Sequence, residues 1–351
     1  MKIDDLLMLA KERGASDLHI NVGSKPAMRI HNELIRMDDQ QRLMPDDTKE
    51  LLFSLLSDAQ AEKLQETGEC DFSFGRPQIG RFRVNIYRQR GTYAAAIRIM
   101  NTEVPRPEEI GLPQSIIQLT QKRSGLVLVT GPTGCGKSTT LAALIQRINE
   151  TRSAHILTLE DPIEYLYRHD QSVVDQREIG LDTGSFAAAL RAALREDPDV
   201  ILVGEMRDLE TISTAITAAE TGHLVFSTLH TIGAASTIDR IIDVFPDGQK
   251  DQIRVQLSSV LESVISQRLV RRADQPGRTA LFEIMHVNNA IRNLIRDNKI
   301  FQIPGIIQTS SKQGMITMDE SLQLAYTKGI ISRDTLLCYA SDAMRARVQN
   351  I

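Results

Sequence analysis

The feature that most constrains the fold is a glycine-rich turn that follows an apolar hexapeptide. Residues 125–130 read GLVLVT, a composition typical of a strand that is buried on both faces. Residues 131–138 read GPTGCGKS, which matches G-x-x-x-x-G-K-[ST], and residues 139–148 are compatible with a helix. Strand, loop and helix therefore follow one another in the order that a phosphate-binding loop requires. The short apolar strands and helical segments beyond Pro113 predict a parallel α/β core.

The predicted loop has the chemistry to hold the phosphates of ATP. Its glycines let backbone N–H groups curl around phosphate oxygens, and the amino end of the following helix adds a positive field. Lys137 is expected to neutralise the β- and γ-phosphates, and Ser138 to bind Mg²⁺. The alternative is a glycine-rich turn that matches by chance, and the flanking strand and helix argue against it. The predicted nucleotide-binding residues are Gly131, Pro132, Thr133, Gly134, Cys135, Gly136, Lys137, Ser138 and Thr139.

Three further apolar runs, residues 156–159, 200–203 and 224–228, are each followed by polar side chains. In a parallel sheet the carboxyl ends of the strands lie along one edge, where ligands bind. The phosphate-binding loop leaves its own strand at that edge. The residues predicted to surround one γ-phosphate are therefore Glu160, Asp161, Glu164, Glu205 and His230.

Hydrolysis of ATP needs one carboxylate to orient or deprotonate water and another to hold Mg²⁺, directly or through its water ligands. Glu205 directly follows a buried strand, as a Walker B acid does, although Gly204 stands where Asp is more usual. We assign Glu205 to the metal and Glu164 to the water, and the two roles are exchangeable. The alternative for each acid is a solvated loop carboxylate, and it is weakest for Glu205.

Two histidines bracket the third of these runs. His223 and His230 lie seven residues apart, about 20 Å in an extended chain. They cannot both contact one phosphate or share a zinc ion. We expect His230 to sense the γ-phosphate. His223 belongs at the other end of the strand, either at a subunit contact or as an ordinary histidine with its hydrogen bonds satisfied.

The first hundred residues predict a small α+β unit. Residues 80–86 alternate apolar and polar side chains, as half-buried strands do, and the run 93–100 places Ile97 and Ile99 opposite Arg98. Two helices are expected before them, the second after Pro45. The apolar positions of these helices are Ile3, Leu6, Leu7 and Ala10 in the first and Leu51, Leu52, Leu55 and Leu56 in the second.

Prolines separate this unit from the rest of the chain. The prolines between Val104 and Pro113 cannot continue a helix or a central strand, so they mark a linker. The sequence therefore predicts an N-terminal domain over residues 1–102, a linker over 103–113 and an ATPase domain over 114–351. The last part of that domain, from about residue 288, is expected to be mostly helical.

Arginines project from the predicted strands of the first domain. Arg81, Arg83 and Arg98 lie opposite apolar residues, so they are not part of a core. P-loop hydrolases often use an arginine to stabilise charge in the transition state. The first domain has no phosphate site of its own, and these arginines could reach the ATP of a neighbouring subunit. Periodicity alone favours a solvated basic strand face.

Composition excludes several classes of protein. With 41 basic and 45 acidic residues, the chain has no overall positive field to attract nucleic acid. No run approaches the ~20 apolar residues of a membrane span, and the amino terminus lacks the apolar core of a signal peptide. Cys70, Cys135 and Cys338 form no C-x-x-C pair, which argues against a zinc module and against a disulfide framework. A reducing cytoplasm fits this pattern best.

The chain resembles the secretion ATPase superfamily of type II secretion and type IV pili. The blocks GPTGCGKSTT (131–140), ILTLEDPIEY (156–165), DPDVILVGEMRDLET (197–211) and TGHLVFSTLHT (221–231) resemble its Walker A, Asp box, atypical Walker B and His box, in that order. Gly204 is therefore expected in this family, and Cys135 replaces a more usual Ser.

Within the superfamily the chain is most similar to the PilT-type retraction ATPases. It is short, lacks the extra N-terminal domains and the tetracysteine module of assembly and secretion members, and has no acidic extension of the PilU-type paralogue. Residues 290–296 read AIRNLIR, which resembles a segment associated in that branch with retraction rather than with ATP binding. The alternative for this segment is an amphipathic helix with basic residues. Its predicted functional residues are Ala290, Ile291, Arg292, Asn293 and Leu294.

The resemblance implies a PAS-like N-terminal domain joined to a RecA-like P-loop ATPase domain. It implies a homohexamer that binds ATP and Mg²⁺ between domains, with Arg83, Arg98 and Arg81 completing the site. The implied function is type IV pilus retraction, which drives twitching motility. The motor would act from the cytoplasm, at the inner membrane, on the polytopic platform protein of the pilus, with or without a paralogous retraction ATPase.

The residues leave three other functions open. An assembly or secretion ATPase shares the chemistry but would need a longer N-terminal region or a cysteine module. A RecA-like nucleic-acid translocase would need basic or aromatic residues along a channel, and this chain is 4% aromatic with no Trp. An ATP-gated scaffold without turnover would release no phosphate in the steady state.

Overall fold

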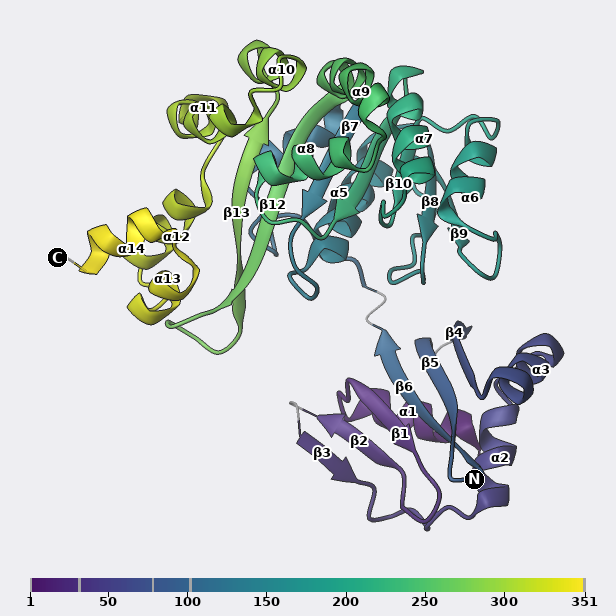
Figure 1. Ribbon diagram of the computed structural model, residues 1–351. Coiled ribbons are helices and arrows are strands. Elements are labelled where there is room, and N and C mark those ends of the chain that lie inside the picture. Colours follow the sequence, from purple (N-terminus) through teal and green to yellow (C-terminus); the bar gives the residue numbers. More distant parts are fainter. Residues whose placement is uncertain (1, 31–32, 78, 101–102, 350–351) are drawn as a thin grey trace. The chain divides into compact units, whose positions relative to one another are not determined.

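The computed structural model describes residues 2–30, 33–77, 79–100 and 103–349 (Figure 1). The chain forms two compact units, each described here by itself. The first is Met1–Glu103 together with Pro162–Leu166, and the second is Val104–Asp161 together with Tyr167–Ile351. None of the helices in the described ranges combines the length and the apolar character needed to cross a membrane.

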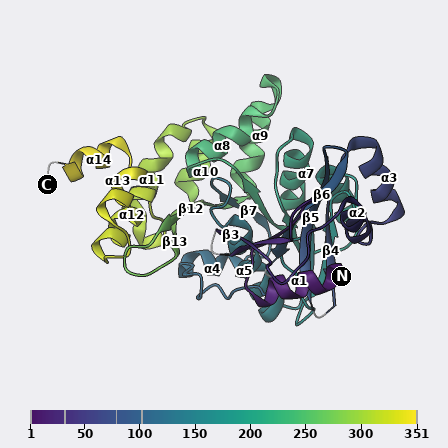
Figure 2. The same ribbon diagram turned by 90° about the horizontal axis from the view of Figure 1, so that it is seen from below.

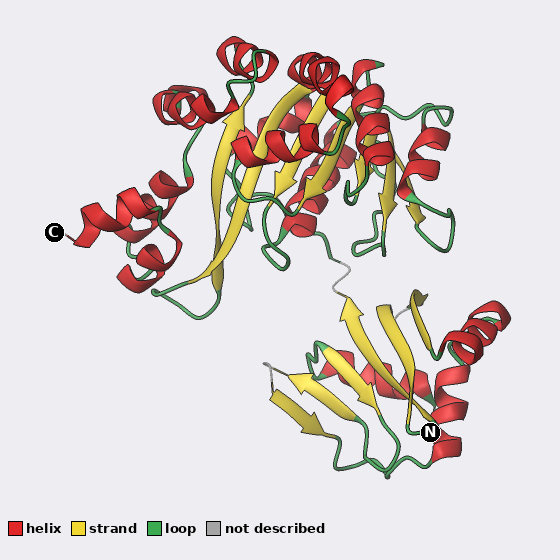
Figure 3. Ribbon diagram, viewed as in Figure 1, coloured by secondary structure: helices red, strands yellow, loops and turns green. Residues whose placement is uncertain are grey.

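The first unit is a six-stranded antiparallel sheet in the order β3-β2-β1-β6-β5-β4, with three helices. The helices pack their apolar residues against one face of this sheet and form a single core with it (Figure 3). The elements, in chain order, are α1 (Ile3–Glu12), β1 (Asp17–Ile20), β2 (Ala27–Ile30), β3 (Glu33–Arg36), α2 (Pro45–Phe53), α3 (Asp58–Thr67), β4 (Glu69–Arg76), β5 (Gly80–Gln89) and β6 (Thr92–Met100).

Alternation along β5 decides which face of that sheet is buried. Phe82, Val84 and Ile86 are fully buried, whereas Arg81 and Arg83 on the other face are half-buried. The alternating pattern predicted for this strand is therefore confirmed. The apolar stripe predicted for the first helix is also buried along its whole length in α1.

The second predicted helix is shorter than expected. Leu55 and Leu56 were expected to continue its apolar stripe, but α2 ends at Phe53, and the Ser54 hydroxyl donates to the Leu51 carbonyl at 2.6 Å. A separate helix, α3, begins after Ser57. The Ser57 and Gln60 side chains each accept a hydrogen bond from the other's backbone N–H, which fixes that new start.

The second unit is built on a seven-stranded sheet in the order β13-β12-β7-β11-β10-β8-β9. All neighbours are parallel except β12 and β13, which form an antiparallel hairpin. The strands are β7 (Gly125–Thr130), β8 (His155–Glu160), β9 (Val173–Glu178), β10 (Val200–Val203), β11 (Leu224–Leu229), β12 (Leu261–Arg271) and β13 (Arg278–His286). The four apolar runs of the sequence are thus confirmed as β7, β8, β10 and β11, whereas β9, β12 and β13 were not predicted.

Helices cover both faces of this sheet, as a RecA-like α/β fold requires. Along β7, Leu126 and Leu128 face one helical layer and Val127 and Val129 face the other. The first layer contains α6 (Phe186–Ala193), α7 (Leu209–Glu220), α8 (Ala234–Asp243), α9 (Asp247–Val260) and α10 (Asn289–Arg296). The second layer contains α4 (Gln114–Ile117) and α5 (Lys137–Thr151).

The carboxyl-terminal part is mostly helical from Asn288 onward, as predicted. After α10 come α11 (Ile303–Thr309), α12 (Met318–Thr327), α13 (Arg333–Tyr339) and α14 (Asp342–Gln349). A small core joins α12 and α13 to the β12–β13 hairpin through Val270, Leu281, Leu322 and Leu336. Both views place these helices beside the hairpin, at one end of the second unit (Figures 1 and 2).

Candidate active site

Four parallel strands bring their carboxyl ends to one edge of the sheet. Backbone pairing aligns Thr130 of β7 with Leu229 of β11, and it aligns Val203 of β10 with both Ser227 of β11 and Leu159 of β8. Because β11 lies between β7 and β10, the residue that follows β11 lies between the glycine-rich loop and the residues that follow β10. Sheet order alone therefore places His230 beside both the loop and Glu205.

The backbone of the loop can be built only with glycines. Gly131, Gly134 and Gly136 have φ of +140°, +76° and +89°, in the region that side chains disfavour. A Cβ on Gly131 would lie 2.3 Å from the carbonyl oxygen of Gln267 and 2.8 Å from Cys135 Sγ. A Cβ on Gly134 would meet nothing within 4 Å, so that peptide borders open space. The loop is thus packed against β12 on one side and open on another.

Lys137 begins α5 and lies over the loop. Its side chain is buried, and its ammonium donates to the carbonyl oxygens of Gly131 at 2.8 Å and Pro132 at 3.1 Å. Ser138 and Thr139 follow in the first turn of the helix, where backbone N–H groups have no partner within the helix. A positive charge, the backbone N–H groups of a first helical turn and a helix amino end therefore converge, which is the chemistry that binds phosphate.

Cys135 occupies the loop as a small apolar residue. Its side chain is 3% exposed, and burial raises the pKa of the thiol, although the charge of Lys137 acts in the opposite direction. The thiol therefore stays protonated near neutral pH. Its role is to fill space beside Gly131, as the expected exchange for Ser implies.

Glu205 is held at both carboxylate oxygens. Oε2 lies 3.4 Å from His230 Nε2, and Oε1 lies 2.8 Å from Arg207 Nε. The Glu205 side chain is only 19% exposed, whereas those of His230 and Arg207 reach solvent more freely. Arg207 was not predicted from the sequence. The feature that could have indicated it is its position two residues after the candidate acid. The structure thus brings Glu205 and His230 together at the predicted edge.

Gly204 leaves room for this arrangement. Its N–H donates to the Leu159 carbonyl at 2.8 Å, and its carbonyl accepts from the Thr228 hydroxyl at 2.6 Å. A Cβ here would approach the Leu159 carbonyl oxygen to 3.2 Å and the Glu160 Cα to 3.5 Å. A side chain here would be tight against the β8 backbone, which would have to shift by a few tenths of an ångström to admit it. That crowding gives a physical reason for glycine at a position where Asp is more usual.

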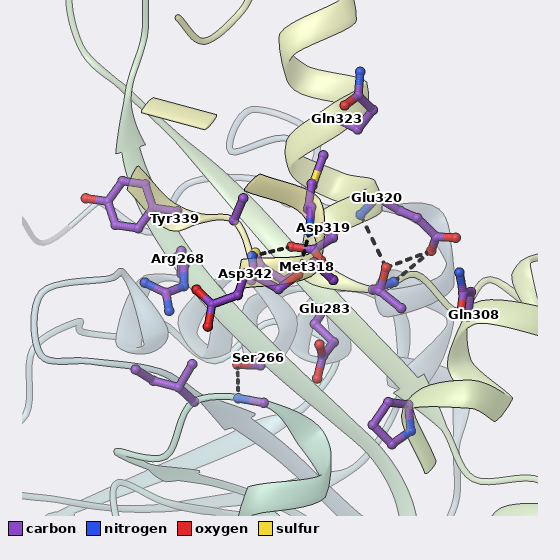
Figure 4. A pocket seen from close by; sticks show the side chains of 18 of the residues that line it. Ser266, Arg268, Glu283, Gln308, Met318, Asp319, Glu320, Gln323, Tyr339 and Asp342 are labelled. Atoms are coloured by element: carbon purple, nitrogen blue, oxygen red, sulfur yellow. Dashed lines mark hydrogen bonds between the residues drawn. The ribbon is translucent and has the colours of Figure 1, made fainter. Parts of the chain in front are cut away.

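The segment after His230 is anchored from the β12–β13 hairpin. Gly233 N donates to the Ser266 hydroxyl at 2.9 Å, and Ala234 N donates to Glu283 Oε1 at 2.7 Å. Glu283 thereby places a carboxylate at the amino end of α8, where the helix dipole favours it. Figure 4 shows Ser266 and Glu283 together on the wall of a cavity of about 1120 Å³. This cavity lies between the hairpin and the C-terminal helices, so its size does not mark the predicted phosphate site.

The other predicted acids are placed differently. Glu160 ends β8, and its Oε1 accepts from the Thr158 hydroxyl at 2.7 Å and from Gln176 Nε2 at 3.3 Å. Asp161 follows it as the last residue of that stretch of the second unit. Glu164 belongs to Pro162–Leu166, which groups with the first unit. Of the residues expected around one phosphate, the second unit therefore contains all except Glu164.

The three arginines lie on the face of the first unit's sheet opposite its core. Arg83 on β5 stands directly opposite Arg98 on β6 in the backbone register. Arg83 pairs with Asp71 at 2.8 Å and Arg98 with Asp17 at 3.2 Å. Like charges directly opposite one another destabilise a sheet, so this pairing opposes folding and needs the two carboxylates. Arg81 donates to the Ser73 hydroxyl at 2.7 Å and to the carbonyl of Ile163, next to Glu164, at 3.1 Å.

His223 lies at the opposite end of β11 from His230. Its ring Nδ1 is 2.9 Å from the Ala218 carbonyl, in the last turn of α7, and its own carbonyl accepts from Gly125 N at 3.0 Å. The imidazole thus has a local hydrogen-bond partner at the amino edge of the sheet. This is the placement expected of an ordinary histidine with its hydrogen bonds satisfied, and a subunit contact stays a proposal.

Residues 290–294 lie in α10. Ile291 is buried, whereas Ala290 and Asn293 are exposed and Leu294 is half-buried. Arg292 Nη1 donates to the last carbonyls of α9, at 2.8 Å to Ser258 and 2.7 Å to Ser259, and its Nη2 lies 3.3 Å from Glu262 Oε1. A cation at a helix carboxyl end satisfies carbonyls that have no partner within the helix. Arg292 therefore binds α10 to the end of α9.

The residues at the sheet edge fit a magnesium nucleotide. Among the described residues no group of three or more His, Cys, Asp and Glu side chains could enclose a metal ion. Mg²⁺ in nucleotide sites takes most of its ligands from phosphate and water, with one or two protein oxygens. The Ser138 hydroxyl and the Glu205 carboxylate are oxygens of the kind that such a site uses. Around Gly134 the loop borders open space, which leaves room for a phosphate group beside its backbone.

Comparison with known proteins agrees with this geometry. A family model described as type II/IV secretion system protein matches residues 2–333. A twitching motility protein of Neisseria gonorrhoeae is 49% identical over 325 residues, which cover 93% of this chain and 84% of that protein. The type IV pilus retraction ATPase PilT of Pseudomonas aeruginosa is 48% identical over 337 residues, which cover 95% of this chain and 96% of that protein.

A solved structure extends the likeness to three dimensions. The crystal structure of the pilus retraction motor PilT with bound ADP matches with a TM-score of 0.94 at 48% identity, over the whole length of both chains. The fold described above is therefore the fold of that motor.

The two arginines of the AIRNLIR segment should differ in their effect on stability. Arg292→Ala removes the hydrogen bonds to Ser258 and Ser259, so we expect the α9–α10 contact to lose about 1–3 kcal/mol. Arg296→Ala is the matched control, because Arg296 bonds to Asn293 in its own helix turn and pairs with the adjacent Asp297. Amide hydrogen exchange at residues 255–262 measures the difference. Equal protection in the two variants would contradict the role of Arg292.

Proposed function

The chain belongs to the type II/IV secretion system protein family, and we propose that it is an ATP-hydrolysing motor that powers type IV pilus retraction. One observation carries the proposal: the loop with Lys137 shares a sheet edge with the Glu205–His230 pair, in a chain nearly half identical along its length to a retraction ATPase. A retraction motor would produce the twitching motility after which the gonococcal relative is named.

The residues at the sheet edge divide the work of hydrolysis. Backbone N–H groups of the loop and the Lys137 ammonium would hold the β- and γ-phosphates. Ser138 and Glu205 would hold Mg²⁺, which supplies neutralisation of the charge on the phosphates. His230, beside Glu205, would donate to the terminal phosphate. Glu164 would orient the attacking water, and its role and that of Glu205 are exchangeable.

The first unit would complete the site of a neighbouring subunit. Arg83 and Arg98 stand directly opposite each other in the backbone register, each paired with a carboxylate, on the sheet face that lies away from the core. Two adjacent guanidinium groups suit the oxygens of a phosphate that gains charge in the transition state. Arg81 lies on the same face. We infer a homohexamer in which these arginines act in trans, which accounts for their place in a unit that has no phosphate loop.

Force would come from nucleotide-dependent motion of the two units. A nucleotide can drive such a change only if it binds one arrangement more tightly than the other. The prolines between Val104 and Pro113 mark where the chain would turn. The motor would work in the cytoplasm against the polytopic platform protein of the inner membrane, with or without a paralogous retraction ATPase. An assembly or secretion ATPase is the second candidate, since it shares the chemistry and reverses the direction of force.

Deletion of the gene followed by microscopy tests the direction of force. If the protein retracts pili, the deletion strain keeps abundant pili and loses twitching, because subunits still assemble and no longer return. Complementation with the wild-type gene should restore movement. Bald cells would indicate an assembly motor and would contradict the proposal.

Two substitutions separate binding of ATP from its hydrolysis. Lys137→Ala should abolish tight nucleotide binding, whereas Glu205→Ala should keep binding and lower phosphate release by about 100-fold or more, a loss typical of a removed transition-state group. Glu210→Ala is the control, because Glu210 is exposed on α7 and pairs with Arg191. Steady-state phosphate release and equilibrium ADP binding measure both steps. Full ATPase activity in Glu205→Ala would refute the assignment of that residue.

Mixing two inactive variants tests whether the arginines act in trans. Arg83→Ala keeps its own phosphate loop, and Lys137→Ala keeps its arginines. Arg83→Ala alone should lose about 10³-fold or more in turnover, the loss expected when such an arginine is removed, and Lys137→Ala alone should be inactive because it no longer binds nucleotide tightly. In mixed hexamers the loop of one variant meets the arginine of the other, so activity should return to a fraction set by the mixing ratio. Mixed hexamers that remain as inactive as either parent would contradict action in trans.

A further inference from the structure

Gln267 on β12 contacts the glycine-rich loop, and it belongs to no motif of the sequence. It directly follows the last parallel pair between β12 and β7, Ser266 with Thr130. Side chains alternate along a strand, so Gln267 lies on the same face as Ile265, which packs in the layer that contains α5. The Gln267 side chain is 2% exposed. A buried amide must find partners, and here both partners belong to the phosphate-binding element.

The amide bridges the loop to the helix that follows it. Gln267 Nε2 donates to the carbonyl oxygen of Cys135 at 2.6 Å, and Gln267 Oε1 accepts from the Thr140 hydroxyl at 2.7 Å. The carbonyl of Cys135 can only accept, so the amide nitrogen must face it and the amide oxygen must face Thr140. The orientation of the side chain is therefore set by its partners.

Fixing that carbonyl also fixes the next N–H. A trans peptide is planar and points its C=O and its N–H in opposite directions. The Cys135 carbonyl points toward Gln267, so the N–H of Gly136 points away from β12. Gly136 has a φ of +89°, and a Cβ there would lie 3.0 Å from Gln267 Nε2. The contact between the Gln267 amide and Gly136 thus defines one orientation of the Cys135–Gly136 peptide.

We propose that Gln267 is a positioning residue, which holds the Cys135–Gly136 peptide so that its N–H faces the phosphates of the bound nucleotide. The proposal rests on the nucleotide-binding part of the proposed function. A hydrogen-bond donor that is already oriented costs no reorganisation when the phosphate arrives. Because the contact serves both substrate and product, its loss should raise KM and the dissociation constant of ADP while kcat changes little.

The test compares variants of the full-length protein. Gln267→Met keeps the length of the side chain and removes both hydrogen bonds, so ADP should bind about tenfold more weakly, the loss expected for one good hydrogen bond. Ser263→Ala is the matched control on the same strand, because the buried Ser263 hydroxyl donates to the Met285 carbonyl and has no contact with the loop. It should lower the unfolding temperature without changing ADP affinity.

Two further variants distinguish positioning from general stability. In Gln267→Glu the carboxylate cannot donate to the Cys135 carbonyl, so affinity should be low at high pH. It should return as the pH falls and the carboxyl gains a proton that it can donate. Thr140→Val should add little to Gln267→Met, because both act on one hydrogen-bonded unit.

ADP titration by calorimetry and thermal unfolding without nucleotide give the two readouts. Wild-type ADP affinity in Gln267→Met, an equal loss of affinity in Ser263→Ala, or a Gln267→Glu variant whose affinity follows the wild-type pH profile would each overturn the positioning role alone. A wild-type protein that binds no ADP would overturn the proposed function together with it.

Discussion

The proposed chemistry depends on one constraint, the parallel backbone pairing of β7, β11, β10 and β8. Every buried N–H and C=O in these strands must be paired, and pairing in parallel register brings their carboxyl ends to the same edge of the sheet. That requirement brings a lysine loop, a histidine and a carboxylate from distant parts of the sequence to one edge. The Glu205–His230 distance of 3.4 Å follows from the adjacency of β10 and β11. The hairpin β12–β13 then supports this edge through Gln267 and Ser266 beneath the loop segments.

The same physics explains which elements the sequence reveals. The strands β7, β8, β10 and β11 are continuous apolar runs because helices cover both of their faces, so hydropathy alone finds them. The strand β12 escaped because Ser263, Ser266 and Gln267 are buried with their polar groups hydrogen-bonded, and such residues look like a surface or a loop in a one-dimensional pattern. For that reason the residues of β12 that pack against the site could not be predicted from the sequence. Lys137, Glu205 and His230 were predicted from the sequence, because each lies in a motif or a polar segment that follows an apolar run.

Pairing between segments that are distant in the sequence sets a second limit on what the sequence alone can predict. The alternation in β5 predicts that Arg83 faces away from the core, but only the register with β6 shows that Arg98 stands directly opposite. The early end of α2 follows from a local competition in which Ser57 starts a new helix, and a stripe of leucines cannot reveal it. Glu164 is the clearest case: its segment groups with the first unit through a contact between Arg81 and Ile163, residues far apart in the chain.

The most direct test of this account is a structure of the assembled protein with Mg²⁺, ADP and beryllium fluoride, which mimics the terminal phosphate. We expect the fluoride group to lie within hydrogen-bond distance of Lys137 Nζ and His230. Glu205 should contact the metal or one of its water ligands. A fluoride group bound in the loop but out of reach of both Glu205 and His230 would contradict it. The pairing of these two side chains would then be a feature of the fold and not of the chemistry.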